Sequence, residues 1–484
     1  MKAIARMTQG HKLFWLAALL CSALSGQAQD ILPESVAAAL RAAQISPSSL
    51  GALVLPLSGG AARLAHLDAR PMAPASTLKL ATTLVALDEL SPTFRWRTQL
   101  LGSGSQRADV WRGTLFLRGG GEPNLTWDGI RYLFRSLRTQ GIRRLDADLV
   151  LDRNFFQPTR PDIGAPVFDE SPNAYYNVIP DALLLGGNLV EFSISADAQR
   201  STVQTQPPLE RLRIDADLTL NDSACETWDD DWDTPQTVLA SDGSISVKLR
   251  GAFPRNCQRK LWLSLLDRNL YIERFVRAYW QELGGNWRGQ VRDGTTPPEA
   301  RLLVERQSET LADLVRPINK ASDNVMARML FLTLGAQLPA SARGDNTLVN
   351  AQAAMQAWFA RNGIATEGLV FENGSGLSRL ERISPRQMAS LLQFGARSNW
   401  YAEFASSLPI VAIDGAMRKR LHDSPAAARA RIKTGSLRDA VAIAGYVRDV
   451  RNQDWVVVAM INDVDARKGR PALDALVHWV AGGN

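Results

Sequence analysis

The stretch that most constrains this chain is Pro74 to Lys79, with the sequence PASTLK, which leads into an apolar run. Pro74 and the helix-forming residues that follow the serine predict that Ser76 lies in the first turn of a helix extending to about Leu90. Since residues three apart share a helix face, the Ser76 hydroxyl and the Lys79 amine should lie side by side. The unpaired amides of a first helical turn also favour an oxyanion. The pattern predicts a nucleophile beside a base, and a capped helix with a surface lysine is the alternative.

Length and composition indicate an exported globular protein. A chain of 484 residues, 45% hydrophobic and 21% charged, is long enough for about two to four domains. Three basic residues precede the apolar run 13–24, and small residues lead up to Ala28. This pattern predicts a secretory signal peptide over residues 1–28, cleaved after Ala28, with an uncleaved membrane anchor as the alternative.

Charge and cysteine content narrow the partners and the compartment. Loss of the three basic residues of the signal lowers the net charge from +6 to +3, which gives no reason to expect a nucleic-acid partner. The remaining pair, Cys225 and Cys257, is predicted to form one disulfide in an oxidising compartment, with two reduced thiols as the alternative. The acidic loop 226–233, which carries Trp228 and Trp232, could bind a cation. We favour a solvated loop with two packing tryptophans and predict no metal site.

The apolar pattern divides the chain into three parts. A helix at 32–43 and strands at 50–57 and 63–67 are expected before the Ser76 helix. The middle of the chain reads as mainly β with few long helices, and strands are predicted at 96–101, 114–118, 145–151, 189–195 and 244–250. Helical periodicity then returns, with helices predicted at 270–283, 309–318, 324–334, 347–362 and 384–396. Strands at 431–434, 441–447 and 455–461 and a helix at 472–480 are predicted to end the chain.

Two further short motifs lie in the C-terminal part. Ser322-Asp323-Asn324 precedes a predicted helix, which gives a hydroxyl and a carboxamide fixed places at the helix entrance. Lys433-Thr434-Gly435-Ser436 lies on a predicted strand, where Gly435 would allow close approach of a substrate backbone. The lysine and the hydroxyls of this strand could hold a carboxylate. Either motif alone is weak evidence, because both patterns are common.

Taken together and in this order, the three motifs form the signature of penicillin-binding proteins and serine β-lactamases. Ser76 and Ser322 are 246 positions apart, which is far more than the catalytic fold needs. The chain therefore resembles the D-alanyl-D-alanine carboxypeptidase/endopeptidase family, the class C low-molecular-mass penicillin-binding proteins. Further matching segments are GGGEPNLT at 119–126, GSGLSR at 374–379, DG at 414–415, KTGSL at 433–437 and AGYV at 444–447. The chain departs from the family pattern at Glu122, Asn373 and Ala416.

The resemblance implies an α/β fold. It predicts a β-lactamase/transpeptidase-like catalytic domain, an antiparallel sheet flanked by helices, assembled from residues 29–95 and 305–484. Residues 96–304 would form a large, mainly β insertion of two nested domains. The resemblance further implies a periplasmic serine DD-peptidase that hydrolyses D-Ala-D-Ala, and D-Ala-meso-diaminopimelate cross-links, through an acyl-serine.

The resemblance also assigns roles to residues of the three motifs. Ser76 would be the nucleophile, and Lys79 its base if burial and nearby positive charge lower the pKa of the amine. The other expected roles are proton relay by Ser322, orientation by Asn324, carboxylate binding by Lys433 and Thr434, close approach at Gly435, and an oxyanion hole from the amides of Ser76 and Ser436. Asp152 and Arg379 are expected to contact the substrate side chain.

The expected partners are peptidoglycan stem peptides and, as covalent inhibitors, β-lactam antibiotics. No cofactor is expected, and peripheral association with a membrane or the cell wall is left open. A β-lactamase, a DD-transpeptidase and a catalytically idle cell-wall-binding protein are the alternatives. A histidine triad or a zinc hydrolase has no support, because the chain lacks a G-x-S-x-G motif and paired histidines at metal spacing.

Overall fold

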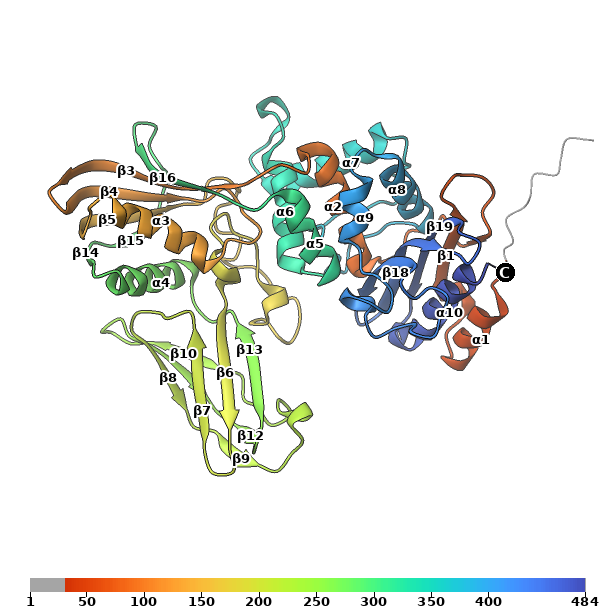
Figure 1. Cartoon of the computed structure of the whole chain (residues 1–484), viewed down its shortest axis with the longest axis horizontal. Helices are drawn as coiled ribbons and strands as arrows, with labels where there is room; N and C mark the ends of the chain where they lie inside the picture. Colours follow the sequence, from red (N-terminus) through yellow and green to blue (C-terminus); the bar gives the residue numbers. More distant parts are fainter. Residues whose placement is uncertain (1–30, 484) are drawn as a thin grey trace, which may run out of the picture.

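The computed structural model describes residues 31–483, so the predicted signal peptide lies outside the described residues. A five-stranded antiparallel sheet in the order β17-β18-β19-β1-β2 joins the two ends of the chain (Figure 1). Its strands are β1 (Leu50–Pro56), β2 (Leu64–His66), β17 (Ala430–Ser436), β18 (Ala440–Arg448) and β19 (Asp454–Asn462). Because β1 pairs with β19 along its whole length, segments about 400 positions apart build one sheet.

Helices cover both faces of this sheet, as the fold class predicted from the resemblance requires. On β18, Ala442, Ala444 and Tyr446 enter one hydrophobic core, while Val441 and Ile443 enter the other, since side chains alternate along a strand. Burial on both faces explains why the strand is an unbroken apolar run. One core is built largely by helices α2 (Lys79–Leu90), α5 (Leu311–Lys320), α6 (Asn324–Ala336), α7 (Thr347–Arg361), α8 (Pro385–Arg397) and α9 (Tyr401–Ser407), and the other by α1 (Glu34–Ala42) and α10 (Arg470–Ala481).

The segment between β2 and α5 contains a second, mixed sheet in the order β14-β5-β4-β3-β16, with β15 also pairing with β5. Its strands are β3 (Arg97–Arg107), β4 (Val110–Arg118), β5 (Arg144–Asp152), β14 (Asn286–Arg288), β15 (Val291–Asp293) and β16 (Arg301–Gln307). Strands β4 and β5 are parallel, and helix α3 (Trp127–Thr139) connects them. Parallel neighbours need such a crossover.

Helix α3 was not predicted from the sequence. The Thr126 side chain accepts a hydrogen bond from the Gly129 amide and caps the helix. Ile130, Leu133 and Leu137 are buried on one face, while arginines lie between them in the sequence. The three-to-four spacing of these residues was the available signal. Helix α4 (Arg268–Glu282) matches the helix predicted at 270–283.

Three small sheets complete the middle of the chain. They are formed by β6 (Val190–Ala196), β7 (Ser201–Gln206) and β13 (Gln258–Leu263), by β8 (Leu212–Ala216), β10 (Gln236–Leu239) and β11 (Ile245–Leu249), and by β9 (Thr219–Asn221) and β12 (Ala252–Pro254). Cys225 and Cys257 form the predicted disulfide. Trp228 packs against Trp232 and Phe253, at ring-centroid distances of 5.3 and 6.1 Å. Within residues 31–483, no cluster of three or more His, Cys, Asp or Glu residues could hold a metal.

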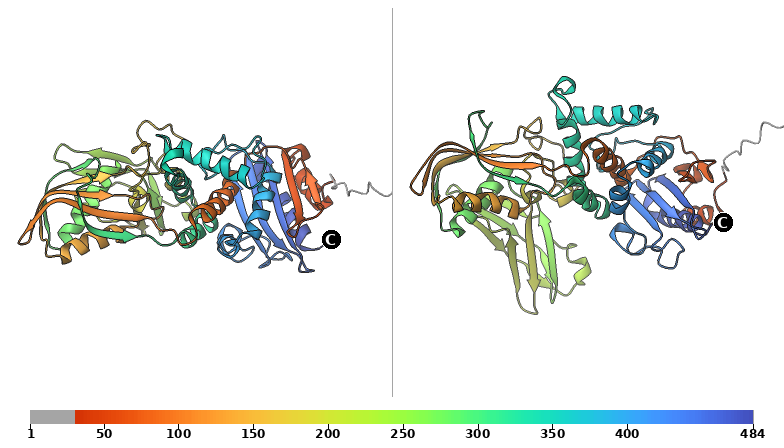
Figure 2. Two further views of the ribbon diagram at one scale, coloured as in Figure 1. Left: turned by 90° about the horizontal axis from the view of Figure 1, so that it is seen from above. Right: turned by 45° about the horizontal axis from the view of Figure 1, so that its top comes forward.

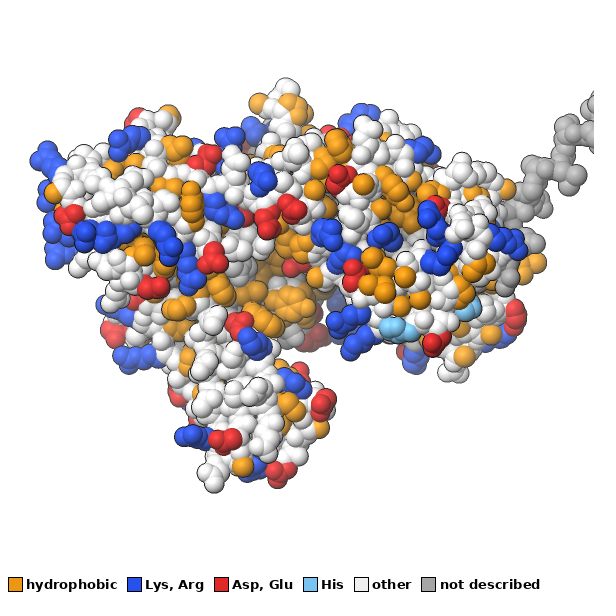
Figure 3. Space-filling model, viewed as in Figure 1, with side chains coloured by type: hydrophobic (Ala, Val, Ile, Leu, Met, Phe, Trp, Pro, Cys, Tyr) orange, Lys and Arg blue, Asp and Glu red, His pale blue; other side chains and the backbone are white. Residues whose placement is uncertain are grey.

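The chain enters and leaves the middle segment through the adjacent antiparallel strands β3 and β16, where Arg97 is opposite Gln307. The mixed sheet lies to one side of the five-stranded sheet along the long axis of the molecule (Figures 1 and 2). The surface is hollowed between them, and hydrophobic side chains gather in the hollow (Figure 3). No helix in the described part of the chain is long and apolar enough to span a membrane.

Candidate active site

Ser76 lies in a tight turn at the entrance of α2. The 3-10 helix Ala75–Leu78 leads directly into α2, which begins at Lys79. The turn is closely packed on two sides, because a Cβ on Gly376 would lie 1.9 Å from the Ala75 carbonyl oxygen and one on Gly435 would lie 2.9 Å from the Ser76 amide nitrogen. A glycine is therefore needed at position 435 so that β17 can approach the serine turn itself, which the sequence did not reveal.

Lys79 is completely buried, and its amine contacts three groups. It donates hydrogen bonds to Ser76 Oγ at 3.1 Å, to Asn324 Oδ1 at 2.6 Å and to the Ser375 carbonyl oxygen at 2.5 Å. Burial lowers the pKa of Lys79 to about 7, although the charges of Asp323 and Glu381 oppose this shift. Near neutral pH a large fraction of the amine is therefore uncharged and able to accept a proton.

The loop that supplies the Ser375 carbonyl is held by a buried glutamate. Glu381 accepts hydrogen bonds from the amides of Asn373, Gly374 and Gly376, at 2.9, 2.7 and 2.9 Å. Burial raises the pKa of its carboxyl group, while these amides oppose the shift. Glu381 thus fixes the backbone that contacts Lys79, but nothing in the sequence distinguishes this glutamate from a surface acid.

Ser322 and Lys433 form a second serine–lysine contact. Lys433 Nζ donates to Ser322 Oγ at 2.9 Å and to the Thr434 carbonyl oxygen at 2.8 Å. Ser322 has a φ of 62°, a conformation that costs free energy in a residue other than glycine, while Asp323 caps α6. Burial, and then the charge of Lys79, lowers the pKa of Lys433 well below its usual value.

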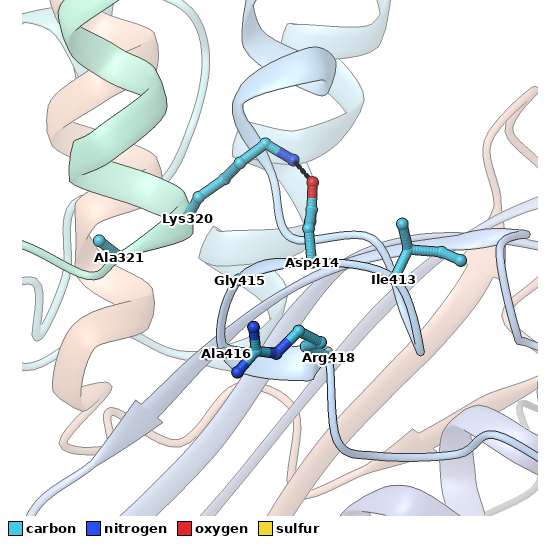
Figure 4. Close-up of a pocket in the computed structure, with 7 residues that line it drawn as sticks. All are labelled: Lys320, Ala321, Ile413, Asp414, Gly415, Ala416 and Arg418. Atoms are coloured by element: carbon cyan, nitrogen blue, oxygen red, sulfur yellow. Dashed lines mark hydrogen bonds and ion pairs between the residues drawn. The ribbon is translucent and has the colours of Figure 1, made fainter.

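The structure thus brings the residues of all three motifs together. Lys79 joins Ser76 to Asn324, and Lys433 joins Ser322 to the edge strand β17. A cavity of about 540 Å³ opens beside Ala321, the neighbour of Ser322 (Figure 4). Across it, the Lys320 amine and the Asp414 carboxylate form an ion pair, which ties the end of α5 to the turn Gly415–Met417.

The sequence predicts that Asp152 and Arg379 contact the substrate side chain, and the structure gives the Asp152 carboxylate other partners. Asp152 is 3% exposed, and its carboxylate accepts hydrogen bonds from the Asn154 amide at 3.0 Å and from the Thr296 amide at 2.8 Å. Asp152 is thus buried within the middle segment. The carboxylate of Asp169 also accepts hydrogen bonds, from Ser171, Tyr176 and Asn177, but it is partly exposed and is influenced by the charge of Arg379. Arg379 instead lies 5.8 Å from the ring centroid of Phe168.

The loop that carries Phe168 brings two acidic residues to the site, and the sequence analysis missed both. Burial alone would raise the pKa of Asp169, but hydrogen bonds and the nearby charge of Arg379 lower it. Glu170 forms an ion pair with Arg438 at 3.0 Å, two residues beyond Ser436. The adjacent acids in a proline-containing loop are visible in the sequence, but their proximity to Arg379 and Arg438, 210 and 268 positions later, is not.

A serine and a lysine at the entrance of a helix packed on such a sheet define the class of active-serine penicillin-binding proteins and β-lactamases. The D-Ala-D-Ala carboxypeptidase 3 (S13) family model matches residues 32–482, and the chain belongs to this family. It is 26% identical over 399 residues to the D-alanyl-D-alanine carboxypeptidase DacB of Haemophilus influenzae, covering 81% of this chain and 80% of that protein. It is 24% identical over 442 residues to the D-alanyl-D-alanine carboxypeptidase of Actinomadura sp., covering 87% and 79%.

Solved structures show the same fold. Penicillin binding protein 4 (dacB) from Haemophilus influenzae superposes with a TM-score of 0.76 at 21% identity, covering 92% of this chain and 99% of that chain. A predatory peptidoglycan endopeptidase from Bdellovibrio bacteriovorus gives a TM-score of 0.50 at 14% identity, covering 90% and 92%. The chain is therefore a serine peptidase of the S13 family with the α/β penicillin-binding fold.

Proposed function

We propose that this enzyme is an exported, periplasmic serine DD-peptidase that removes terminal D-alanine from peptidoglycan stem peptides and cleaves D-Ala-meso-diaminopimelate cross-links. Membership of the S13 family supports the reaction class. The observation that carries the mechanism is the buried Lys79 amine, which contacts Ser76 and has a pKa of about 7. This amine has the properties of a general base at neutral pH.

Acylation begins at Ser76. The uncharged amine of Lys79 takes the hydroxyl proton of Ser76 as its oxygen attacks the carbonyl carbon of the penultimate D-alanine. The backbone amides of Ser76 and Ser436 stabilise the oxyanion, and loss of one such donor costs about 3 kcal/mol in other enzymes. The close approach of β17 to the serine turn supports this arrangement, because a Cβ on Gly435 would lie 2.9 Å from the Ser76 amide nitrogen.

The leaving amine then needs a proton. Ser322 is placed to relay to it the proton that Lys79 took from Ser76, which leaves the Lys79 amine uncharged again, and Lys433 holds the Ser322 hydroxyl in position. Asn324 orients Lys79 and the amide of the substrate, while Lys433 and Thr434 bind the carboxylate of the leaving group. Water then hydrolyses the acyl-serine with Lys79 as the base, which restores the free enzyme.

The neighbouring charges of Arg379 and Asp169 fit a zwitterionic side chain. Arg379 and Asp169 lie close enough to interact, so one ligand that carries both an ammonium and a carboxylate can be bound by both. The distal centre of meso-diaminopimelate has this chemistry. We therefore assign the contact with the third residue of the stem peptide to Asp169 and Arg379, in place of Asp152.

β-lactams should acylate the same serine. Penicillin binding protein 4 of Haemophilus influenzae has been solved in complex with a β-lactam, and it shares the present fold with a TM-score of 0.72. We infer that penicillin forms an ester with Ser76 that is hydrolysed slowly.

Digestion of purified muropeptides tests this function. Loss of one alanine from a pentapeptide monomer and release of monomers from cross-linked dimers, both followed by mass spectrometry, are the expected results. Folded enzyme that produces neither product would point to a cell-wall-binding protein instead. Rapid turnover of penicillin would indicate a β-lactamase, and transfer of the acyl group to an added amino acid would indicate a transpeptidase.

A further inference from the structure

A basic cavity lies at the end of β17. It has a volume of about 240 Å³, and Thr434, Gly435 and Ser436 line it together with Arg420 and Arg470. Nη2 of Arg470 donates a hydrogen bond to Ser436 Oγ at 2.9 Å. The first residue of α10 thus contacts the strand that carries the lysine-threonine-glycine motif.

The two arginines of this cavity differ in their charge partners. Arg420 forms an ion pair with Asp474, with Nη2 at 2.6 Å and Nε at 3.1 Å from the same carboxylate oxygen. For Arg470, no carboxylate oxygen within residues 31–483 lies at ion-pair distance, and its side chain is bonded to the neutral hydroxyl of Ser436. The cavity therefore contains one guanidinium whose charge is not balanced by a direct partner.

The position of Arg470 argues against a role in stabilising its own helix. It is the first residue of α10, where the positive end of the helix dipole disfavours a cation. The structure therefore gives Arg470 no helix-stabilising function that would explain its charge at this place.

The contact also fixes the direction of the Ser436 hydroxyl. A guanidinium can only donate hydrogen bonds, so the Ser436 oxygen must accept this one. The hydroxyl hydrogen of Ser436 is then free to be donated to another acceptor. An anion in the cavity would meet a hydroxyl donor backed by a full positive charge, and hydrogen bonds assisted by charge are the stronger kind.

From this geometry we propose that Arg470 is a specificity-determining residue that, with Ser436, recognises the carboxylate on the carbon next to the leaving amine. The inference rests on the proposed DD-peptidase function. Terminal D-alanine and the diaminopimelate centre of a cross-link both carry such a carboxylate. Arg470 therefore selects for a free carboxylate at this position, whichever of the two bonds is cleaved.

A matched pair of substrates tests this selection. We would measure kcat/KM for an acyl-D-Ala-D-Ala peptide and for the same peptide with a C-terminal amide, using wild type, Arg470→Ala and Arg467→Ala. Arg470→Ala should lower kcat/KM about 10- to 100-fold for the acid and less than about threefold for the amide. Arg467, a neighbouring arginine that donates a hydrogen bond to the Leu437 carbonyl at 3.4 Å, controls for the loss of one positive charge. Its alanine variant should change neither substrate more than about threefold.

The outcomes separate this proposal from the function on which it rests. Equal losses on acid and amide, or no loss on either, would overturn the role of Arg470 while leaving the peptidase function intact. Wild-type enzyme that does not hydrolyse the acid peptide would instead contradict the function itself.

Two further variants check the route through Ser436. If Arg470 acts through that hydroxyl, the double variant Ser436→Ala, Arg470→Ala should lose less kcat/KM for the acid peptide than the two single variants predict when their fold-losses are multiplied. Arg470→Lys, which keeps the charge, should recover part of the preference for the acid. An unchanged thermal midpoint of Arg470→Ala shows that the variant folds. A double variant whose loss equals the product would contradict the coupling.

Discussion

Two regions of this molecule each bury a pair of cations, and they balance the charges differently. In the catalytic region, Lys79 and Lys433 are fully buried and donate to hydroxyl, amide and carbonyl oxygens. In the middle segment, Arg153 and Arg268 share the buried carboxylate of Asp181, at 2.8 and 3.2 Å. For neither lysine does the described part of the chain place a carboxylate oxygen within ion-pair distance.

The difference separates the pair that we propose to be catalytic from a structural one. A buried cation without an anionic partner is costly in its charged form, so its pKa falls, as it does for both lysines. A buried arginine paired with a carboxylate stays charged and ties its segments together. Asp181 joins the residue after β5 to the first residue of α4. Burial of the two lysines lowers stability but provides an amine that can accept a proton. The arginine pair instead holds the inserted segment in place.

The largest effect on kcat/KM should follow removal of the buried Lys79 amine. Lys79→Met should lower kcat/KM for a D-Ala-D-Ala peptide by about 10⁴-fold, because it removes the general base. It should not lower the free energy of unfolding, since an apolar side chain of similar size replaces a poorly compensated amine. Lys419→Met, at an exposed lysine of the catalytic region, is the control for both measurements. Retention of a tenth of the wild-type kcat/KM would show that another group is the base.

Removal of the Asp181 carboxylate should lower the free energy of unfolding and leave kcat/KM unchanged, the opposite of the result expected for Lys79→Met. Asp181→Ala leaves Arg153 and Arg268 only their more exposed partners, Asp293 and Asp162, and should lower the free energy of unfolding by about 3 kcal/mol. For the protein that remains folded, kcat/KM on a short peptide should stay within about twofold of wild type. Asp128→Ala breaks the pair with Arg131, whose aspartate is 87% exposed, and should cost less than about 0.5 kcal/mol. Urea unfolding followed by fluorescence measures both, and equal losses in the two variants would refute the comparison.

Loss of the disulfide should also act on stability alone. Cys225 and Cys257 are 32 positions apart, and removal of such a link typically costs about 2–4 kcal/mol. The Cys225→Ser, Cys257→Ser double variant should therefore unfold at lower urea concentration, as should wild type under reducing conditions. Its kcat/KM on a short peptide should be unchanged. A large fall in activity would mean that the small sheets influence the serine site.

The pH dependence should reveal the unpaired lysine directly. With a pKa of about 7, Lys79 becomes protonated as the pH falls, so kcat/KM should drop about tenfold per unit below pH 7. Its pKa in the folded state is below its usual 10.5, so the unfolded chain binds more protons between about pH 7 and 10.5. Across this window the residue makes the folded state relatively more stable as the pH rises. Lys79→Met should lack this pH-dependent contribution to stability. Asp181→Ala should keep the wild-type pH midpoint of kcat/KM. A shifted midpoint in that variant would show that the arginine pair influences the pKa of Lys79.

The sequence identified the motif residues that the structure brings together, but few of the contacts around them. Ser76, Lys79, Ser322 and Lys433 could be found because each lies in a short motif, and the order of the motifs narrowed the class. The antiparallel sheet flanked by helices followed from the resemblance and is confirmed. These features depend on local patterns that can be recognised in the sequence.

Features that depend on distant contacts were missed or misassigned. Asp152 resembled a substrate-binding aspartate, but amides of its own segment occupy both of its oxygens. Asp169 lies near Arg379 only because a long loop brings the two together, and Glu381 is buried against backbone amides of the single loop 372–376. No periodicity or spacing encodes such proximity. Helix α3 differs from these, since the apolar spacing of Ile130, Leu133 and Leu137 is present in the sequence.

Labelling with penicillin tests the central claim most directly. Intact mass spectrometry of wild-type enzyme incubated with penicillin should show one added penicilloyl group, which peptide mapping should place on Ser76. Ser76→Ala, with the same unfolding profile as wild type, should show no added mass. A covalent penicilloyl group on the folded Ser76→Ala protein would contradict the account, because the nucleophile would then lie elsewhere.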